Sequence, residues 1–378
     1  MLKSLCIFLV FLLSTLAFTQ KKDYAEKKDK LDGFIKNWMQ KDSVPGVFLM
    51  IAKDGQVLKQ KGYGYANLEL KTKPQSNTVF EIGAITQMFT AAAICMLEEQ
   101  KKIDLDSSIT KYIDSLPQGW KLATVRNLLY HSHGLNPEHF DKTLLHGQPG
   151  YRYTVREQLF FFKPQRQYAL AGTAAYYTDA AFFLLGVIIQ NVSRMSYEDF
   201  IQKNIFDKAG MKNSSFINRK ITTPNQAQGY TLHSGKWIPW MLEQNIQSLD
   251  CNSFTGILSN AENLLLFDKA LRDNSLVKKE TYQQILEPFI LPDGKPASSG
   301  RSSWGMGCLV RDIQGHQCVF HTGITGTGFY RFPKDGLTVV VFTNLGNGDD
   351  FLKDKGADMP ITGYNLAEEV LTDYLLKK

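Results

Sequence analysis

One stretch in the first third of the chain determines where the centre of the fold must lie. From Met88 to Leu97 the sequence, "MFTAAAICML", is apolar at nearly every position. A helix of this composition has no polar face to turn toward water, so it must be buried on all sides. We therefore expect a helix here that is surrounded by the rest of the protein, with Cys95 as a core residue.

Strand patterns occur toward both ends of the chain, and helical patterns lie between them. Two β-rich runs flank the turn dipeptide Asp54-Gly55, and later strands are predicted in "WGMGCLV", "QCVFHTG", "GFYRFP" and "LTVVVFTN". A last helix is predicted in "GYNLAEEVLTDYLLKK". This order predicts an α+β fold, with an antiparallel sheet built from both termini and flanked by helices. The predicted parts are an α/β lobe over residues 20–104 and 246–378 and a mostly helical inserted lobe over 105–245.

The first 19 residues have the pattern of a secretory signal peptide. Lys3 precedes the apolar run "CIFLVFLLSTLAF", and the small residues Ala17 and Thr19 stand at −3 and −1 of a cut after Thr19. An uncleaved anchor is the alternative, but the run is shorter than the roughly 20 residues that a spanning helix needs. We predict cleavage, no other membrane contact, and a periplasmic or secreted protein.

Charge and cysteine usage narrow the classes of function. The formal net charge is +6, without a basic block interleaved with aromatic residues, so a nucleic-acid partner is not expected. Cys308 and Cys318 flank a predicted hairpin, where they form either a cross-strand disulfide or two buried free thiols. His131 and His133 are interpreted as part of a turn rather than as a metal pair. We expect neither a metal nor a cofactor.

Four patches of sequence occur in a recognisable order: "EIGAITQMFT", "TVRNLLYHSHGL", "YYTDAAFFLLG" and "FHTGITGTGF". Together they resemble the serine β-lactamase and penicillin-binding-protein superfamily, in its branch of class C β-lactamases, esterases and D-Ala-D-Ala peptidases. The resemblance covers roughly residues 30–375 and implies a β-lactamase/transpeptidase-like fold. In catalytic members the first patch contains Ser-x-x-Lys, the third Tyr-x-Asn, and the fourth Lys or His followed by Thr-Gly.

The resemblance also implies how such a site works. The serine at the first turn of a helix attacks a carbonyl group, and the lysine lies one turn away on the same helix face. The lysine helps to remove the hydroxyl proton, and the tyrosine shares in this proton transfer. Backbone N–H groups stabilise the developing oxyanion.

This chain departs from the family pattern at several of these positions. Ala84 stands where the serine is expected, and Gln87, which can neither carry charge nor act as a base, stands where the lysine is expected. Asp179 replaces the asparagine of the Tyr-x-Asn motif. The resemblance thus implies a ligand-binding cleft without an intact catalytic set, formed by Ala84, Gln87, Tyr177, Asp179, His321, Thr322, Gly323 and Ile324.

Three functions are compatible with these departures. The first is a catalytically inactive relative that binds a peptide, a peptidoglycan fragment or a partner protein in the former active cleft. The second is an unconventional hydrolase of esters, amides or D-amino-acid peptides, in which His321 or Tyr177 activates water. The third is a purely structural or interaction protein. Because several patches depart together, we favour a natural loss of the serine and lysine over an engineered one.

Overall fold

The following description is based on a computed structural model. It describes residues 31–114, 116, 118–134, 153–161, 168–217, 221–240, 252–323 and 326–346. The predicted signal peptide, the predicted last helix and Ile324 lie outside these residues.

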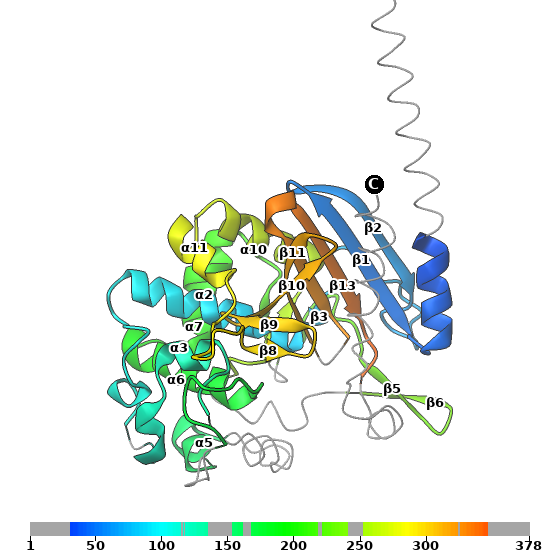
Figure 1. The fold of residues 1–378 in the computed structure, drawn as a ribbon. Helices are drawn as coiled ribbons and strands as arrows, with labels where there is room; N and C mark the ends of the chain where they lie inside the picture. The colour runs from blue at the N-terminus through cyan, green and yellow to red at the C-terminus, as the bar shows by residue number, and fades with distance from the viewer. Residues whose placement is uncertain are drawn as a thin grey trace, which may run out of the picture.

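An antiparallel sheet of eight strands forms the largest element, in the order β2-β1-β13-β12-β11-β10-β9-β8. Strand β1 lies between the edge strand β2 and β13, so strands from distant parts of the sequence pair directly (Figure 1). This confirms the predicted α+β fold with a sheet built from both ends of the chain. The strands are β1 (Gly46–Lys53), β2 (Gln56–Gly64), β8 (Ser298–Ser299), β9 (Ser302–Gly305), β10 (Cys308–Ile313), β11 (His316–Thr322), β12 (Gly328–Phe332) and β13 (Leu337–Thr343).

Both faces of this sheet are covered, which explains why the side chains of β1 and β13 are apolar on both faces rather than in alternation. In β1, Val47 and Leu49 belong to a core cluster shared with Leu31 and Ile35 of the helix over residues 31–41. Phe48 belongs to a second, larger cluster on the opposite face. Figure 1 shows the first helix on one side of the sheet and the remaining helices on the other.

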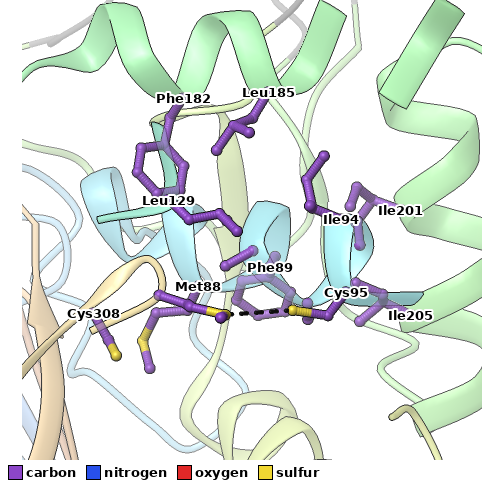
Figure 2. Packing of buried hydrophobic residues seen from close by; sticks show 14 of the residues in the cluster. Met88, Phe89, Ile94, Cys95, Leu129, Phe182, Leu185, Ile201, Ile205 and Cys308 are labelled. Atoms are coloured by element: carbon purple, nitrogen blue, oxygen red, sulfur yellow. Dashed lines mark hydrogen bonds between the residues drawn. The ribbon is translucent and has the colours of Figure 1, made fainter. Parts of the chain in front are cut away.

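The larger cluster surrounds α2 (Thr86–Glu99), the helix predicted to be buried on all sides. Every side chain from Thr86 to Leu97 is buried, which confirms that prediction. Figure 2 shows Met88, Phe89 and Ile94 packed among side chains of neighbouring helices. Cys95 is fully buried, its thiol donates to Met306 Sδ at 3.8 Å, and burial raises its pKa, as expected for a core thiol.

The other elements complete the helical side of the molecule and two small sheets. Ser196 caps α7 and Asn260 caps α10, each by accepting a hydrogen bond from a backbone N–H two or three residues into the helix. The boundaries between the two predicted lobes stay a prediction. The remaining elements are β3 (Phe80–Glu81), β4 (Ser215–Phe216), β5 (Tyr230–His233), β6 (Lys236–Pro239), β7 (Ile257–Ser259), η1 (Gly83–Ile85), η2 (Ile109–Lys111), η3 (Gln118–Leu122), α3 (Val125–Leu129), α5 (Val155–Phe161), α6 (Asp179–Ser193), α7 (Tyr197–Ile201), the π-helix η4 (Gln202–Phe206), α8 (Asp207–Ala209), α10 (Ala261–Arg272), α11 (Lys279–Ile285) and η5 (Pro333–Asp335).

The hairpin of β10 and β11 is present as predicted, but it does not contain a disulfide. Cys318 lies opposite Arg311, and Cys308 lies opposite Gly305 of the neighbouring strand β9. Both cysteines are buried free thiols, and burial raises the pKa of Cys308 to about 12. The register of the hairpin therefore excludes the disulfide alternative and leaves the free-thiol alternative.

Among the residues that the structure describes, no group of three or more His, Cys, Asp or Glu side chains is arranged to hold a metal ion. No helix within the same residues has both the length and the apolar character needed to cross a bilayer.

A buried charge cluster attaches the helix over residues 31–41 to strand β2. The Asp32 carboxylate accepts hydrogen bonds from Lys59, Lys61 and Tyr63. Burial raises the pKa of Asp32, but these three hydrogen bonds outweigh it and hold the pKa well below the usual range. A lowered pKa gives stability that is fully present above the unfolded pKa of about 4 and is lost progressively as the pH falls from there toward the folded pKa. The cluster therefore contributes fully at neutral pH.

We expect Asp32→Asn to lower the free energy of unfolding by about 1–2 kcal/mol near pH 7, because the buried Lys59 loses its partner. The difference from the original protein should shrink as the pH falls below about 4. Chemical denaturation at both pH values measures this effect. Asp293→Asn, at an exposed carboxylate, is the matched control. An Asp32→Asn protein as stable as this control near pH 7 would contradict the assignment.

Candidate functional site

The start of helix α2 is held rigidly between two sheets. The Ile82 N–H donates to the Ile257 carbonyl of β7 at 3.1 Å, and Ile85 N–H donates back to the Ile82 carbonyl at 3.3 Å. Gly83 has a φ of +55°, which an L side chain rarely adopts, and it turns the chain from β3 into η1. The helical turn that follows places half-buried Ala84 one turn before Gln87, on the same side.

The His-Thr-Gly patch lies directly against this turn. A Cβ atom on Gly323 would be 2.4 Å from the Ile82 carbonyl oxygen and 2.3 Å from Thr327 Oγ1, so only glycine fits there. The Thr327 hydroxyl also donates to the Ile82 carbonyl at 3.2 Å. The close approach brings the end of β11, with His321 and Thr322, beside the start of the central helix.

The third predicted patch reaches the same place from helix α6. Thr178 caps this helix with an extended backbone, so Tyr177 and Asp179 point to the same side of the chain. Gln87 Nε2 donates to the Tyr177 hydroxyl at 2.9 Å and to Asp179 Oδ1 at 3.3 Å. The Tyr177 hydroxyl in turn donates to Asp179 Oδ1 at 2.7 Å. These three side chains, predicted separately, form one hydrogen-bonded group, which we call the amide–phenol–carboxylate group.

This group is unusual because its carboxylate has no cation beside it. No lysine or arginine within the described part of the chain forms an ion pair with Asp179, and Gln87 is neutral. Burial raises the pKa of Asp179 to about 6, although the hydrogen bond from Tyr177 opposes the shift. The carboxyl group is therefore mostly ionised at neutral pH but becomes neutral under mildly acidic conditions.

The rings of His131 and Trp304, two residues that the sequence did not assign to the cleft, pack close to the ring of Tyr177. The ring of buried His131 lies 4.9 Å from Tyr177 and 4.4 Å from Trp304, measured between ring centroids. Trp304 also stacks on Tyr177 at 5.8 Å. His131 Nδ1 accepts from the Thr178 N–H at 3.4 Å, and its carbonyl accepts from the Tyr176 N–H at 2.9 Å.

The turn predicted around His131 is present, and His131 itself has a φ of +53°. A histidine at a turn and a tryptophan on a strand carry no sequence signal for a shared site. The ring of His131 lies beside Tyr177 because His131 has a positive φ and because its loop is hydrogen-bonded to the segment before α6.

His321 is buried beside this group, with its ring 6.4 Å from that of Tyr177. Its Nδ1 lies 2.9 Å from both the nitrogen and the oxygen of the Thr322 backbone, and its Nε2 has no hydrogen-bond partner among the described residues. Burial lowers its pKa to about 4, so the ring is neutral near pH 7. Thr322 and Gly323 follow it at the end of β11, and Ile324 lies outside the described residues.

A separate hollow of about 300 Å³ lies elsewhere and shares no residue with this group. Its lining combines the aromatic wall of Trp240 with the ends of β3 and β13, and consists of Phe80, Glu81, Ala227, Gly229, Trp240, Thr343, Asn344 and Leu345. The chemistry predicted from the sequence therefore lies outside this hollow.

The fold and the four patches together define a protein of the β-lactamase and penicillin-binding-protein type. The sequence profile of the family described as beta-lactamase matches residues 31–360. The chain belongs to this beta-lactamase family.

Two relatives are similar to this chain at low sequence identity. The chain is 26% identical over 316 residues to the putative penicillin-binding protein PbpX of Bacillus subtilis, covering 83% of this chain and 74% of that protein. It is 24% identical over 334 residues to protein flp of Staphylococcus aureus, covering 85% of this chain. The match spans only 64% of the length of protein flp.

Solved structures show the same fold. A penicillin-binding protein homologue from Pyrococcus abyssi superposes with a TM-score of 0.77 at 27% identity, covering 93% of this chain and 78% of that chain. A class C β-lactamase superposes with a TM-score of 0.74 at 20% identity, covering 94% and 98% of the two chains. The architecture is therefore β-lactamase/transpeptidase-like.

Replacing Asp179 by asparagine should stabilise the protein at neutral pH. A carboxyl group whose pKa is raised on folding favours the folded state below its unfolded pKa and loses this contribution as the pH rises through about 6. Since the side chain is partly exposed, we expect Asp179→Asn to raise the free energy of unfolding by about 1–2 kcal/mol near pH 7.5.

The gain should disappear near pH 4, where the carboxyl group is already neutral in the original protein. Thermal and chemical denaturation at the two pH values measure the difference, with exposed Asp293→Asn as the control. A loss of stability near pH 7.5 would show that Asp179 is paired with a cation.

Proposed function

We propose that this chain is a non-catalytic member of its family, which binds a ligand in the former active cleft without cleaving it. The observation that carries the proposal is the environment of Gln87. Its side-chain amide occupies the position that the sequence resemblance gives to the lysine base, and it is already hydrogen-bonded to Tyr177 and Asp179. An amide cannot remove a proton from a nucleophile, and the methyl group of Ala84 offers no nucleophile to deprotonate.

The backbone supports retention of binding. The Ala84 N–H donates to no other described residue, so it stays available to a ligand carbonyl or anion at the first turn of the helix. Catalysis needs side chains at this point, whereas carbonyl binding needs only the backbone. Loss of Ser and Lys thus removes the reaction and leaves the binding donor in place.

The ligand that we propose is a peptide, a peptidoglycan fragment or a segment of a partner protein. Two features support this class: the relatives include a putative penicillin-binding protein, and the first 19 residues have the pattern of a signal peptide, which would direct the chain to the periplasm or out of the cell. A purely structural role would require the cleft to take no ligand. The half-exposed ring of Tyr177 and the free Ala84 N–H favour an open binding surface over a filled one.

The alternative of a hydrolase that activates water through His321 is less favoured by the site. A general base works best when its pKa lies near the working pH. The His321 imidazole, with a pKa of about 4, binds a proton too weakly to be efficient near pH 7.

We expect hydrolysis of small esters and D-amino-acid amides by the purified protein to stay at the level of a buffer blank. If slow hydrolysis is found, His321→Ala and Tyr177→Phe decide its origin. Loss of that rate in either variant would support the water-activating hydrolase, and an unchanged rate in both would remove it.

We expect the original protein to form no covalent adduct with a labelled penicillin or a fluorophosphonate, because Ala84 has no hydroxyl group. Intact-protein mass spectrometry after prolonged incubation measures this. An adduct mapped to any residue of the cleft would refute the proposal.

Restoring the chemistry provides the matched control. Ala84→Ser combined with Gln87→Lys should regain acylation, whereas Ala84→Ser alone should be slower by about 10²-fold or more without the base. A double variant that is folded but does not acylate would indicate that Asp179 or another departure from the family pattern has closed or repolarised the cleft.

A further inference from the structure

The charge of the cleft indicates which end of a ligand it would bind. The family pattern has a lysine at the position of Gln87 and a neutral asparagine at that of Asp179. This chain has the reverse: a neutral amide from α2 and a carboxylate from the first turn of α6. The site has thus lost its cation and gained an anion, so its electrostatic preference should be opposite to that of the family pattern.

The hydrogen bonds of the amide–phenol–carboxylate group leave acceptors rather than donors unused. Asp179 Oδ1 receives both hydrogen bonds, from Gln87 and Tyr177, whereas Oδ2 receives none from the described residues. Gln87 Oε1 likewise has no partner among these residues, but its side chain is fully enclosed, so a ligand does not reach it. The unused carboxylate oxygen of Asp179 favours a ligand that brings N–H donors.

The surrounding rings suit a cation as well. Tyr177 is 38% exposed and lies against Trp304, so its ring offers a π face beside the Asp179 carboxylate. An ammonium group is attracted to aromatic faces, and the attraction grows when water is excluded. Carboxylate and aromatic ring together match the N–H donors and the positive charge of a protonated amine.

The other titratable groups near Asp179 do not change this balance. They are Tyr177 on the adjacent turn, His131 and His133 after α3, and His321 on β11. Burial lowers the pKa of His131 well below its usual value, that of His133 to about 3 and that of His321 to about 4. All three rings are therefore neutral above about pH 5, and none supplies a cation that would compete for the carboxylate.

We propose that the cleft recognises its ligand through a protonated amine, which binds the Asp179 carboxylate over the Tyr177 ring while a ligand carbonyl accepts from the Ala84 N–H. This inference rests on the proposed non-catalytic binding function and specifies its ligand: an amine-bearing peptide end or amino-acid amide rather than a free carboxylate.

The experiment compares three probes that share the D-alanyl-D-alanine skeleton and differ in their terminal groups: D-alanyl-D-alanine amide, N-acetyl-D-alanyl-D-alanine, and N-acetyl-D-alanyl-D-alanine amide. The first carries only the ammonium group, the second only the carboxylate, and the third neither. Calorimetry or protein chemical shifts near pH 7.5 give the three dissociation constants. We expect the ammonium probe to bind at least about tenfold more tightly than the other two.

Two variants and one change of pH test the assignment to Asp179. Asp179→Asn should remove the advantage of the ammonium probe, and Gln87→Lys should reverse it by placing a cation beside the carboxylate. Lowering the pH from about 7.5 to 5 should weaken the ammonium probe by about tenfold, because Asp179 then becomes protonated. The neutral probe should change little over the same range, and exposed Asp293→Asn should behave as the original protein.

Tighter binding of the carboxylate probe, or no binding of the ammonium probe, would overturn the inference. So would an ammonium advantage that survives in a folded Asp179→Asn protein. None of these results bears on covalent labelling by penicillin, which tests the proposed loss of catalysis. Failure of the amine inference and failure of the proposed loss of catalysis are therefore distinguishable.

Discussion

The complete burial of helix α2 is the constraint on which the rest of the structure depends. Because each face of this helix is apolar, the sheet must cover one side and the helices α6, α7 and α10 the others. The N-terminal turn of such a helix is then fixed by its surroundings rather than by its own sequence. Ile82 is hydrogen-bonded to β7 and contacted by Gly323. These contacts fix the backbone position of residues 84 and 87.

That rigidity allows the side chains at this turn to differ from the family pattern without disturbing the fold. Ala84 and Gln87 need no new backbone conformation, and Gln87 finds partners in Tyr177 and Asp179. A lysine there would offset the buried carboxylate by direct charge pairing. A glutamine offsets it only by hydrogen bonding, and the raised pKa of Asp179 is the physical consequence.

Sequence patterns predicted the parts of this molecule that depend on local or periodic information. The all-apolar helix, the two hairpins and the association of strands from both ends are of this kind. The register that keeps Cys308 and Cys318 apart, and the ring of His131 beneath Tyr177, depend on tertiary contacts between segments. Likewise the patches gave the identity of Gln87, Tyr177 and Asp179, but not that these three side chains bond to one another.

Binding of a ligand carbonyl and catalysis would depend on different atoms of this cleft. A carbonyl group is held by a backbone N–H, which every residue except proline supplies, so it is insensitive to the identity of residue 84. The proposed charge recognition depends instead on side chains, because Gln87 is a neutral amide and Asp179 a carboxylate. If the proposal holds, two side-chain identities on a fixed backbone set the charge of the ligand that the cleft selects.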